Sequence, residues 1–184
     1  MISSYMSWFD GVDLVAASIA GLPMPNVIVH FARLVHTPVG SAPAGMIFIP
    51  DAANPAQPRV FGFVSPDPEV GAYFGPKIFA GTPFEKAPVL TGTIDVTLAL
   101  VEKRAAVRVS VAGFVIESVL SRLGDLRSAD RPAGSLPFGE HSVEARAAEA
   151  RVVVNGQPLP IILPPAGLSG GPAAVYSATG FYAR

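Results

Sequence analysis

The chain of 184 residues contains no cysteine, and this absence removes several kinds of chemistry at once. Without thiols there is no disulfide bond, no thiol nucleophile and no thiolate-bound metal. The sequence also lacks the Gly-x-Ser-x-Gly turn that presents the nucleophile of many serine hydrolases. Residues 167–171 (GLSGG) have the glycines without that spacing, and they lack the lysine and following helix of a phosphate-binding loop. We expect a turn there, and no cofactor.

Charged residues are scarce, because they make up only 15% of the chain against roughly 25% in an average soluble domain. The formal net charge is −1, and the one basic cluster is the short stretch at residues 102–104. A phosphate backbone requires a concentrated basic surface. The composition therefore argues against nucleic acid as a partner.

Long hydrophobic runs are missing too, although half of the residues are hydrophobic. No run approaches the roughly 18 residues that span a bilayer, so we expect no transmembrane segment. The first residues lack the basic segment and apolar core of a signal peptide, which predicts a cytoplasmic protein, and we expect a bacterial origin. The surplus of apolar side chains must be buried within the domain or between copies of it. We therefore expect a homo-oligomer or a complex with another protein.

Proline and glycine are frequent, with 19 and 18 copies spread through the chain. They separate apolar segments of strand length, which is the pattern of an all-β protein. The strongest signal lies at residues 94–111, where apolar and polar side chains alternate on both sides of the charged stretch 102–104. This period of two predicts an antiparallel hairpin with one solvated face.

Further strands are predicted from similar but shorter patterns. Asn155 and Gly156 lie between apolar arms and favour a two-residue hairpin turn, whose return arm carries Pro158 and Pro160 and so belongs at an edge. The other predicted strands are residues 12–20 (with a short helix as the alternative), 26–36, 45–50 and 59–65 as a second hairpin, and 172–184 as a final or edge strand.

Two segments fit either a helix or a strand, namely residues 114–124 and 140–151. Residues 128–141, which overlap the second of them, are expected to form an exposed loop, and no position divides the chain into two domains. The sequence therefore predicts a single domain, residues 1–184, that is all-β and mainly antiparallel. Its architecture is a β-sandwich or flattened barrel, with a jelly-roll-like order among the options and at most one or two short helices.

The histidines His30 and His36 lie in one apolar segment and would project from the same face of a strand. At roughly 3.3 Å per residue they lie about 20 Å apart, too far to share a metal ion. The residue two positions after His30 is Ala32, and the only other histidine is His141. We therefore expect no metal site, with His30 as the candidate if one exists, and a structural role for both residues.

Catalytic candidates are limited to Glu140 and His141, a neighbouring pair in the predicted loop. A glutamate and a histidine can act as general acid or base, provided that a substrate pocket lies within reach. The competing interpretation is an ordinary solvated loop.

Aromatic side chains give the binding candidates, which are Trp8, Tyr73, Phe74, Phe79 and Phe84. The last four lie in the glycine- and proline-rich tract 71–84, where we expect a loop, and apolar loop residues need a surface to cover. Either the loop folds over its own sheet, or it docks against another copy or another protein.

Residues 20–55 carry a Gly-Leu-Pro-Met-Pro turn (21–25), an alternating strand, a Leu-Val-x-Thr-Pro ending (34–38) and Asn54-Pro55. With these features the segment resembles an uncharacterised bacterial family, domain of unknown function 1842. The resemblance implies a small bacterial β-rich domain without an established activity, and it implies no functional residues.

Two functions follow from these observations. The first is a non-enzymatic binding or self-assembling β-sandwich domain, because charge is low and catalytic motifs are missing. The alternative is a small-molecule-binding or cyclase-like enzyme with an apolar pocket inside a β-barrel, because such a site needs only a suitable shape and one or two polar groups.

Overall fold

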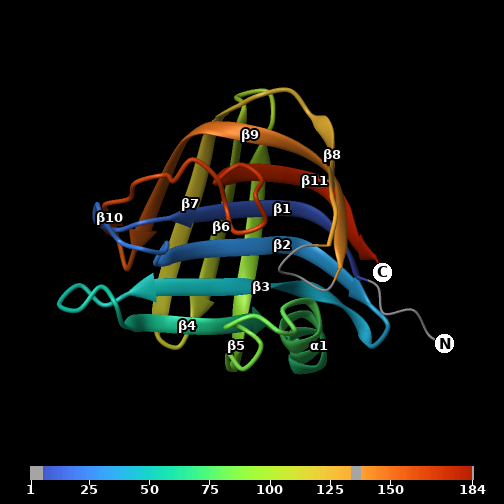
Figure 1. Ribbon diagram of the computed structural model, residues 1–184, viewed down its shortest axis with the longest axis horizontal. Coiled ribbons are helices and arrows are strands. Elements are labelled where there is room, and N and C mark those ends of the chain that lie inside the picture. The colour runs from blue at the N-terminus through green and yellow to red at the C-terminus, as the bar shows by residue number, and fades with distance from the viewer. Residues whose placement is uncertain (1–5, 134–137, 184) are drawn as a thin grey trace.

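The computed structural model describes residues 6–133 and 138–183. These residues form one α-helix and eleven strands (Figure 1). The predicted all-β fold with few helices is therefore confirmed. In chain order the elements are β1 (Met6–Ala16), β2 (Val27–Thr37), β3 (Gly40–Pro50), β4 (Pro58–Ser65), α1 (Pro68–Ile78), β5 (Val89–Ala99), β6 (Arg104–Val111), β7 (Phe114–Leu123), β8 (Arg127–Arg131), β9 (Gly139–Val154), β10 (Gln157–Leu159) and β11 (Ala174–Ala183).

The sheet closes on itself through β9, the longest strand. Residues 139–146 of β9 pair with β11, and residues 147–154 pair with β7. Because β11 also pairs with β1, the path from β1 to β7 returns to its start and forms a flattened barrel. Figure 1 shows β1–β4 crossing in front of β5–β7. Most neighbours along the chain are neighbours in the sheet, which differs from the strand order of a jelly roll.

Several predicted strands pair as expected. In the β5–β6 hairpin Ile94 lies opposite Val109, and β3 pairs antiparallel with β4. Asn155 and Gly156 both have positive φ, 49° and 79°, which is what a type I′ turn requires. That turn joins β9 to β10, which lies at an edge as predicted.

The structure decides two segments that the sequence left open, and it differs from the expected loop. Residues 114–124 and 140–151 are strands, in β7 and β9, because each is flanked by a pairing partner on either side. The final strand β11 lies between β9 and β1 rather than at an edge. The predicted loop 128–141 contains most of β8 and the start of β9, while its residues 134–137 lie outside the described ranges.

The helix forms in the tract that was expected to be a loop. The side chain of Asp67 caps α1 by accepting hydrogen bonds from the backbone N–H groups of Glu69 and Val70. This helix provides the crossover that two parallel strands need, because β4 and β5 are the parallel pair of the barrel. Within the described residues, no helix is long and apolar enough to cross a membrane.

Two apolar clusters pack against opposite faces of the barrel wall. The interior is filled by side chains such as Val12, Val29 and Leu120. The outer cluster lies between the wall and α1, and includes Trp8 and Phe74. The barrel interior is therefore a packed core, and the outer face of β1–β3 is where a second layer covers the sheet.

Alternation along the wall changes phase in three neighbouring strands. Trp8 and Asp13 are five positions apart yet lie on the same outer face, because Asp10 between them has a φ of 54° and interrupts the alternation. The pairing register also shifts between Ala32 and Val35, and between Ser177 and Thr179. Because of these interruptions, residues that are an odd number of positions apart, such as Trp8 and Asp13, lie on the same outer face.

Candidate functional site

A cavity of about 280 Å³ lies on the outer face of the barrel wall. Its floor is the sheet of β1, β2, β3, β9 and β11, and its cover is made by the segment that follows α1 and by the loop before β11. Figure 1 shows this last loop crossing in front of β11 and β1. The cavity therefore differs in position from the pocket expected inside the barrel, which is filled by the interior core.

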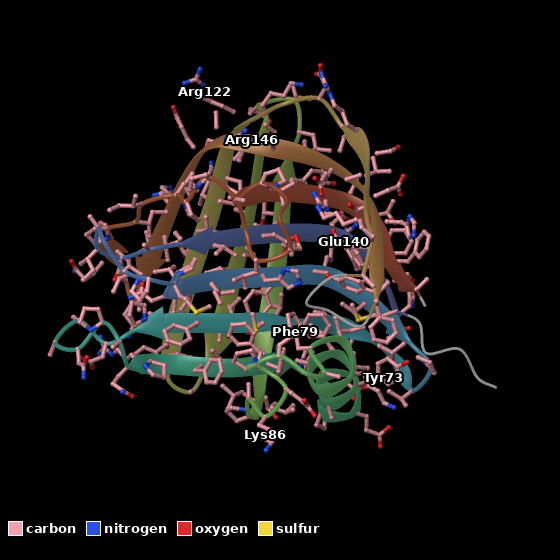
Figure 2. All side chains as sticks on the ribbon, in the orientation of Figure 1. Tyr73, Phe79, Lys86, Arg122, Glu140 and Arg146 are labelled. Carbon is pink, nitrogen blue, oxygen red and sulfur yellow. The ribbon has the colours of Figure 1, made fainter. Side chains whose placement is uncertain are left out.

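The wall of the cavity is mainly apolar. Aromatic rings of Trp8, Phe79 and Phe84 and aliphatic side chains such as Ile28 and Met46 line it. Figure 2 shows Phe79 next to α1 and Glu140 near β11 and β1. The two residues therefore reach the cavity from different elements. Apolar walls that enclose a few polar groups are typical of sites for small molecules.

Asp13 and His30 form the first polar pair of the cavity. They lie opposite each other on β1 and β2, and His30 Nδ1 is 2.6 Å from Asp13 Oδ1. The ring of His30 stacks on Phe74 with centroids 5.9 Å apart. Burial alone would lower the pKa of His30, but the charge and hydrogen bond of Asp13, helped by the charge of Glu140, raise it above 6.5.

Arg131 connects the other two carboxylates of the site. Its Nη1 donates to Glu140 Oε1 at 2.8 Å, and its Nη2 donates to Glu144. Only 17% of the Arg131 side chain is exposed. The covering loop rests on this guanidinium so closely that a Cβ on Gly171 would lie 2.5 Å from Nη2. Strand β8 thus contributes the cation that keeps two buried carboxylates together.

The surroundings of Glu140 shift its pKa upward. Burial raises its pKa above the ordinary value of 4.5, although Arg131 acts in the opposite direction. The negative charge of Asp13, and to a smaller extent that of Glu144, raises the pKa further. Glu140 therefore binds a proton more tightly than a solvated glutamate does.

Tyr182 completes the polar end of the cavity. Its side chain is only 4% exposed, and among the described residues no group forms a hydrogen bond with its hydroxyl. Burial and the charges of Glu140 and Asp13 raise its pKa well above 10, so the hydroxyl keeps its proton at physiological pH. A hydroxyl at a cavity wall that has no partner among the described residues is available to a ligand.

No protein-family model, curated protein or solved structure matches the chain. The resemblance of residues 20–55 to domain of unknown function 1842 stays a prediction. The site must therefore be interpreted from its own chemistry.

The two catalytic candidates separate onto opposite faces of β9. Glu140 faces the cavity, whereas His141 points away from it. There His141 Nδ1 lies 2.6 Å from Asp130 Oδ1, and its ring stacks on Phe181 with centroids 4.8 Å apart. Adjacent residues of a strand face opposite sides, so the neighbouring pair could not act together.

His30, the metal candidate, lies in the cavity beside carboxylates. Nevertheless, no group of three or more potential ligands is arranged around a common point within the described ranges. His36, at the other end of β2, contacts Ser41 through Nδ1 at 2.6 Å and packs edge-on against Phe9. The two histidines thus have separate environments.

The aromatic candidates are divided between the cavity and the core. Trp8, Phe79 and Phe84 line the cavity, whereas Phe74 is 2% exposed and packs between Phe63 and His30. Tyr73 lies at the side of α1 (Figure 2) and is not among the residues that line the cavity. The tract 71–84 therefore folds over its own sheet, and burial within one chain leaves Phe74 unavailable to a partner.

Four polar residues of the site were not singled out from the sequence, namely Asp13, Arg131, Glu144 and Tyr182. They lie on four different strands, β1, β8, β9 and β11. Only the pairing register of these strands brings them together. The spacing of Glu140 and Glu144 on one strand was the one usable signal, because an even separation places both on one face.

Proposed function

We propose that the cavity on the outer face of the barrel binds a small molecule with an apolar body and one polar end. The observation that carries this proposal is an apolar cavity of about 280 Å³ lined at one end by Tyr182, whose hydroxyl has no hydrogen-bond partner among the described residues. That volume is near the lower end of the roughly 300–1,000 Å³ range of ligand pockets. The ligand is accordingly small.

The orientation of the ligand follows from the distribution of polar groups. The apolar body packs against Trp8, Phe79 and Phe84, and the polar end points towards His30 and Tyr182. Groups held by neighbours bind at lower entropic cost than free side chains. Here Asp13 fixes the ring of His30, and the hydrogen bond from Trp8 Nε1 to Ser177 Oγ, 3.0 Å long, fixes the indole.

Tryptophan emission tests this proposal directly, because Trp8 is the only tryptophan of the chain. We expect uncharged n-octanol to change the emission in a saturable way with one site per chain. Val175→Phe fills the cavity from the rigid strand β11 and is expected to abolish saturation. Val101→Phe, in the exposed β5–β6 turn, is the matched control and is expected to leave binding unchanged. If neither n-octanol nor its charged analogues saturate the wild-type site, the proposal fails.

A second candidate function, an enzyme that transfers protons without a cofactor, is favoured by one contact. Asp13 engages Nδ1 of His30, while no described residue hydrogen-bonds to Nε2, which is the arrangement of a general acid or base. In such a reaction neutral His30 would take a proton from the carbon next to a carbonyl group, and Tyr182 would donate a hydrogen bond to the enolate oxygen. Deuterium exchange into 2-octanone in D₂O, followed by NMR, tests this candidate. Exchange no faster than in buffer, or unchanged in His30→Gln, would rule it out.

Self-association, expected from the composition, stays a prediction. Much of the apolar surplus on which it rested is accounted for by the two clusters, since the covering layer of α1 and its following segment buries aromatic side chains within the chain.

A further inference from the structure

The polar end of the cavity contains more negative than positive charge. The carboxylates are Asp13, Glu140 and Glu144, and the groups that oppose them are Arg131 and His30. Even with His30 protonated, three carboxylates face two cations among the described residues that line the cavity, which leaves one negative charge there without an opposite charge. An uncompensated charge in a partly desolvated site is costly, so the site favours either a bound proton or a bound cation.

We infer that the ligand of this cavity is a small amphipathic amine, whose single positive charge lies beside Glu140 and whose apolar body lies against the aromatic wall. This inference rests on the proposed binding function and specifies its ligand class.

Hydrogen-bonding capacity at the site matches an ammonium group. A primary ammonium offers three donors and no acceptor. The residues with acceptor oxygens that line this end of the cavity include Glu140, Asp13, Glu144 and Tyr182, and the hydroxyl of Tyr182 has no hydrogen-bond partner among the described residues. The ammonium would thus provide a donor to these acceptors.

The aromatic wall favours a cation for a separate reason. The faces of aromatic rings are electronegative and attract positive charge within about 6 Å. Of the aromatic residues that line the cavity, Trp8 packs against Tyr182 at the polar end, with ring centroids 4.9 Å apart. An aromatic ring near the carboxylates adds to the attraction for an amine over an alcohol of the same shape.

An anionic ligand is disfavoured by the same arrangement. The guanidinium of Arg131 already donates to Glu140 and Glu144, so it is occupied by the chain itself. A ligand carboxylate would bring a further negative charge into a site that already has a surplus.

Three probes of equal length test the inference at neutral pH, namely n-octylamine, n-octanol and n-octanoate. Because a hydrogen bond to a charged group contributes roughly 1.5–3 kcal/mol, we expect octylamine to bind at least about tenfold more tightly than octanol, and octanoate most weakly. Equal affinities for octylamine and octanol would overturn the amine inference and leave the binding function intact. Saturation by none of the three would overturn the binding function itself.

Glu140→Gln removes the charge while it keeps the shape of the side chain. We expect this variant to bind octylamine at least about tenfold more weakly than the wild type, and to lose more affinity for octylamine than for octanol. Glu117→Gln, on the exposed face of β7, is the matched control and is expected to change neither. Retention of full octylamine affinity in Glu140→Gln would contradict the inference.

A measurement on the wild-type protein covers the case in which the variant does not fold. Octyltrimethylammonium carries its charge at every pH, so only the protein titrates. Asp13 raises the pKa of His30 and burial raises that of Glu140, so raising the pH through these pKa values removes a proton from each group. The site becomes more negative, and we expect the affinity to rise with pH. A flat or falling affinity would overturn the inference.

Discussion

Gly180 lies directly beneath the indole of Trp8, its partner across the β1–β11 pair. A Cβ at position 180 would stand 2.2 Å from Cζ2 of the indole. The absence of a side chain at this position allows the tryptophan ring to lie flat against the barrel wall, where its other neighbour is Tyr182, with ring centroids 4.9 Å apart. The shape of the cavity thus depends on a glycine that contributes no atoms to its lining.

Gly180→Ala is expected to displace the indole of Trp8. Overpacking of a filled site costs roughly 1–3 kcal/mol of unfolding free energy, and the shifted ring should weaken octanol binding. Chemical denaturation and tryptophan emission measure the two effects. The control is Gly124→Ala, where the nearest atom lies 3.6 Å from the added Cβ. If Gly180→Ala and Gly124→Ala have the same unfolding free energy and the same octanol affinity, the close contact between position 180 and the indole is contradicted.

Arg131→Met should reduce the unfolding free energy by about 3 kcal/mol, because it leaves two buried carboxylates without their shared partner. Arg108→Met removes a different guanidinium, which pairs with Glu117 at 2.7 Å but is more than half exposed. Exposed pairs contribute at most about 1 kcal/mol, so this control should change little. Urea denaturation measures the unfolding free energy of both variants. If Arg131→Met and Arg108→Met lose similar amounts, burial does not distinguish the two ion-pair sites.

The pH dependence of stability has a definite sign at His30 and Glu140. Both bind their proton more tightly in the folded state, so each contributes stability that is present at low pH and lost as pH rises. The loss begins at the unfolded values, 4.5 for Glu140 and 6.5 for His30, and ends at their higher folded values.

His30→Gln and Glu140→Gln isolate these contributions by difference from the wild type. We expect the unfolding free energy of the wild type, relative to His30→Gln, to fall with pH above 6.5. Relative to Glu140→Gln, the fall should begin near 4.5. A difference that rises with pH in either window would contradict the pKa direction of that group.

Ser118→Ala should leave stability unchanged or raise it by about 1 kcal/mol. The hydroxyl of Ser118 is buried opposite Val107 and Val152, and none of the described groups hydrogen-bonds to it. Removing an unpaired buried hydroxyl relieves a desolvation cost. Ser177→Ala is the contrasting variant, since it removes the acceptor of the Trp8 indole and should cost about 1 kcal/mol. Thermal unfolding distinguishes the two, and a loss at Ser118 as large as that at Ser177 would refute the assignment.

Alternation and turn chemistry predicted most of the fold from the sequence. The β5–β6 hairpin followed from a period of two on both arms, and the turn at Asn155-Gly156 from residues that tolerate positive φ. The helix α1 was missed because its tract 68–78 is rich in glycine and proline, yet the Asp67 cap and the parallel β4–β5 connection stabilise a helix there. Tertiary context outweighed local propensity at that point.

The site was less predictable, because it depends on register. Glu140 and the aromatics Trp8, Phe79 and Phe84 were identified individually, but no sequence feature placed them around one cavity. Trp8 and Asp13 share a face only through the positive φ of Asp10, a conformation that their separation of five does not suggest. Strand order and these interruptions are long-range properties, whereas sequence periodicity is local.

The use of β9 and β11 to close the barrel has a consequence for synthesis on the ribosome. Strand β1 acquires its β11 partner only after the intervening residues 17–173 have been translated. Until then the nascent β1–β4 sheet carries an open edge, and unpaired edges template association between chains. We expect premature termination before residue 174 to yield fragments that aggregate through this edge.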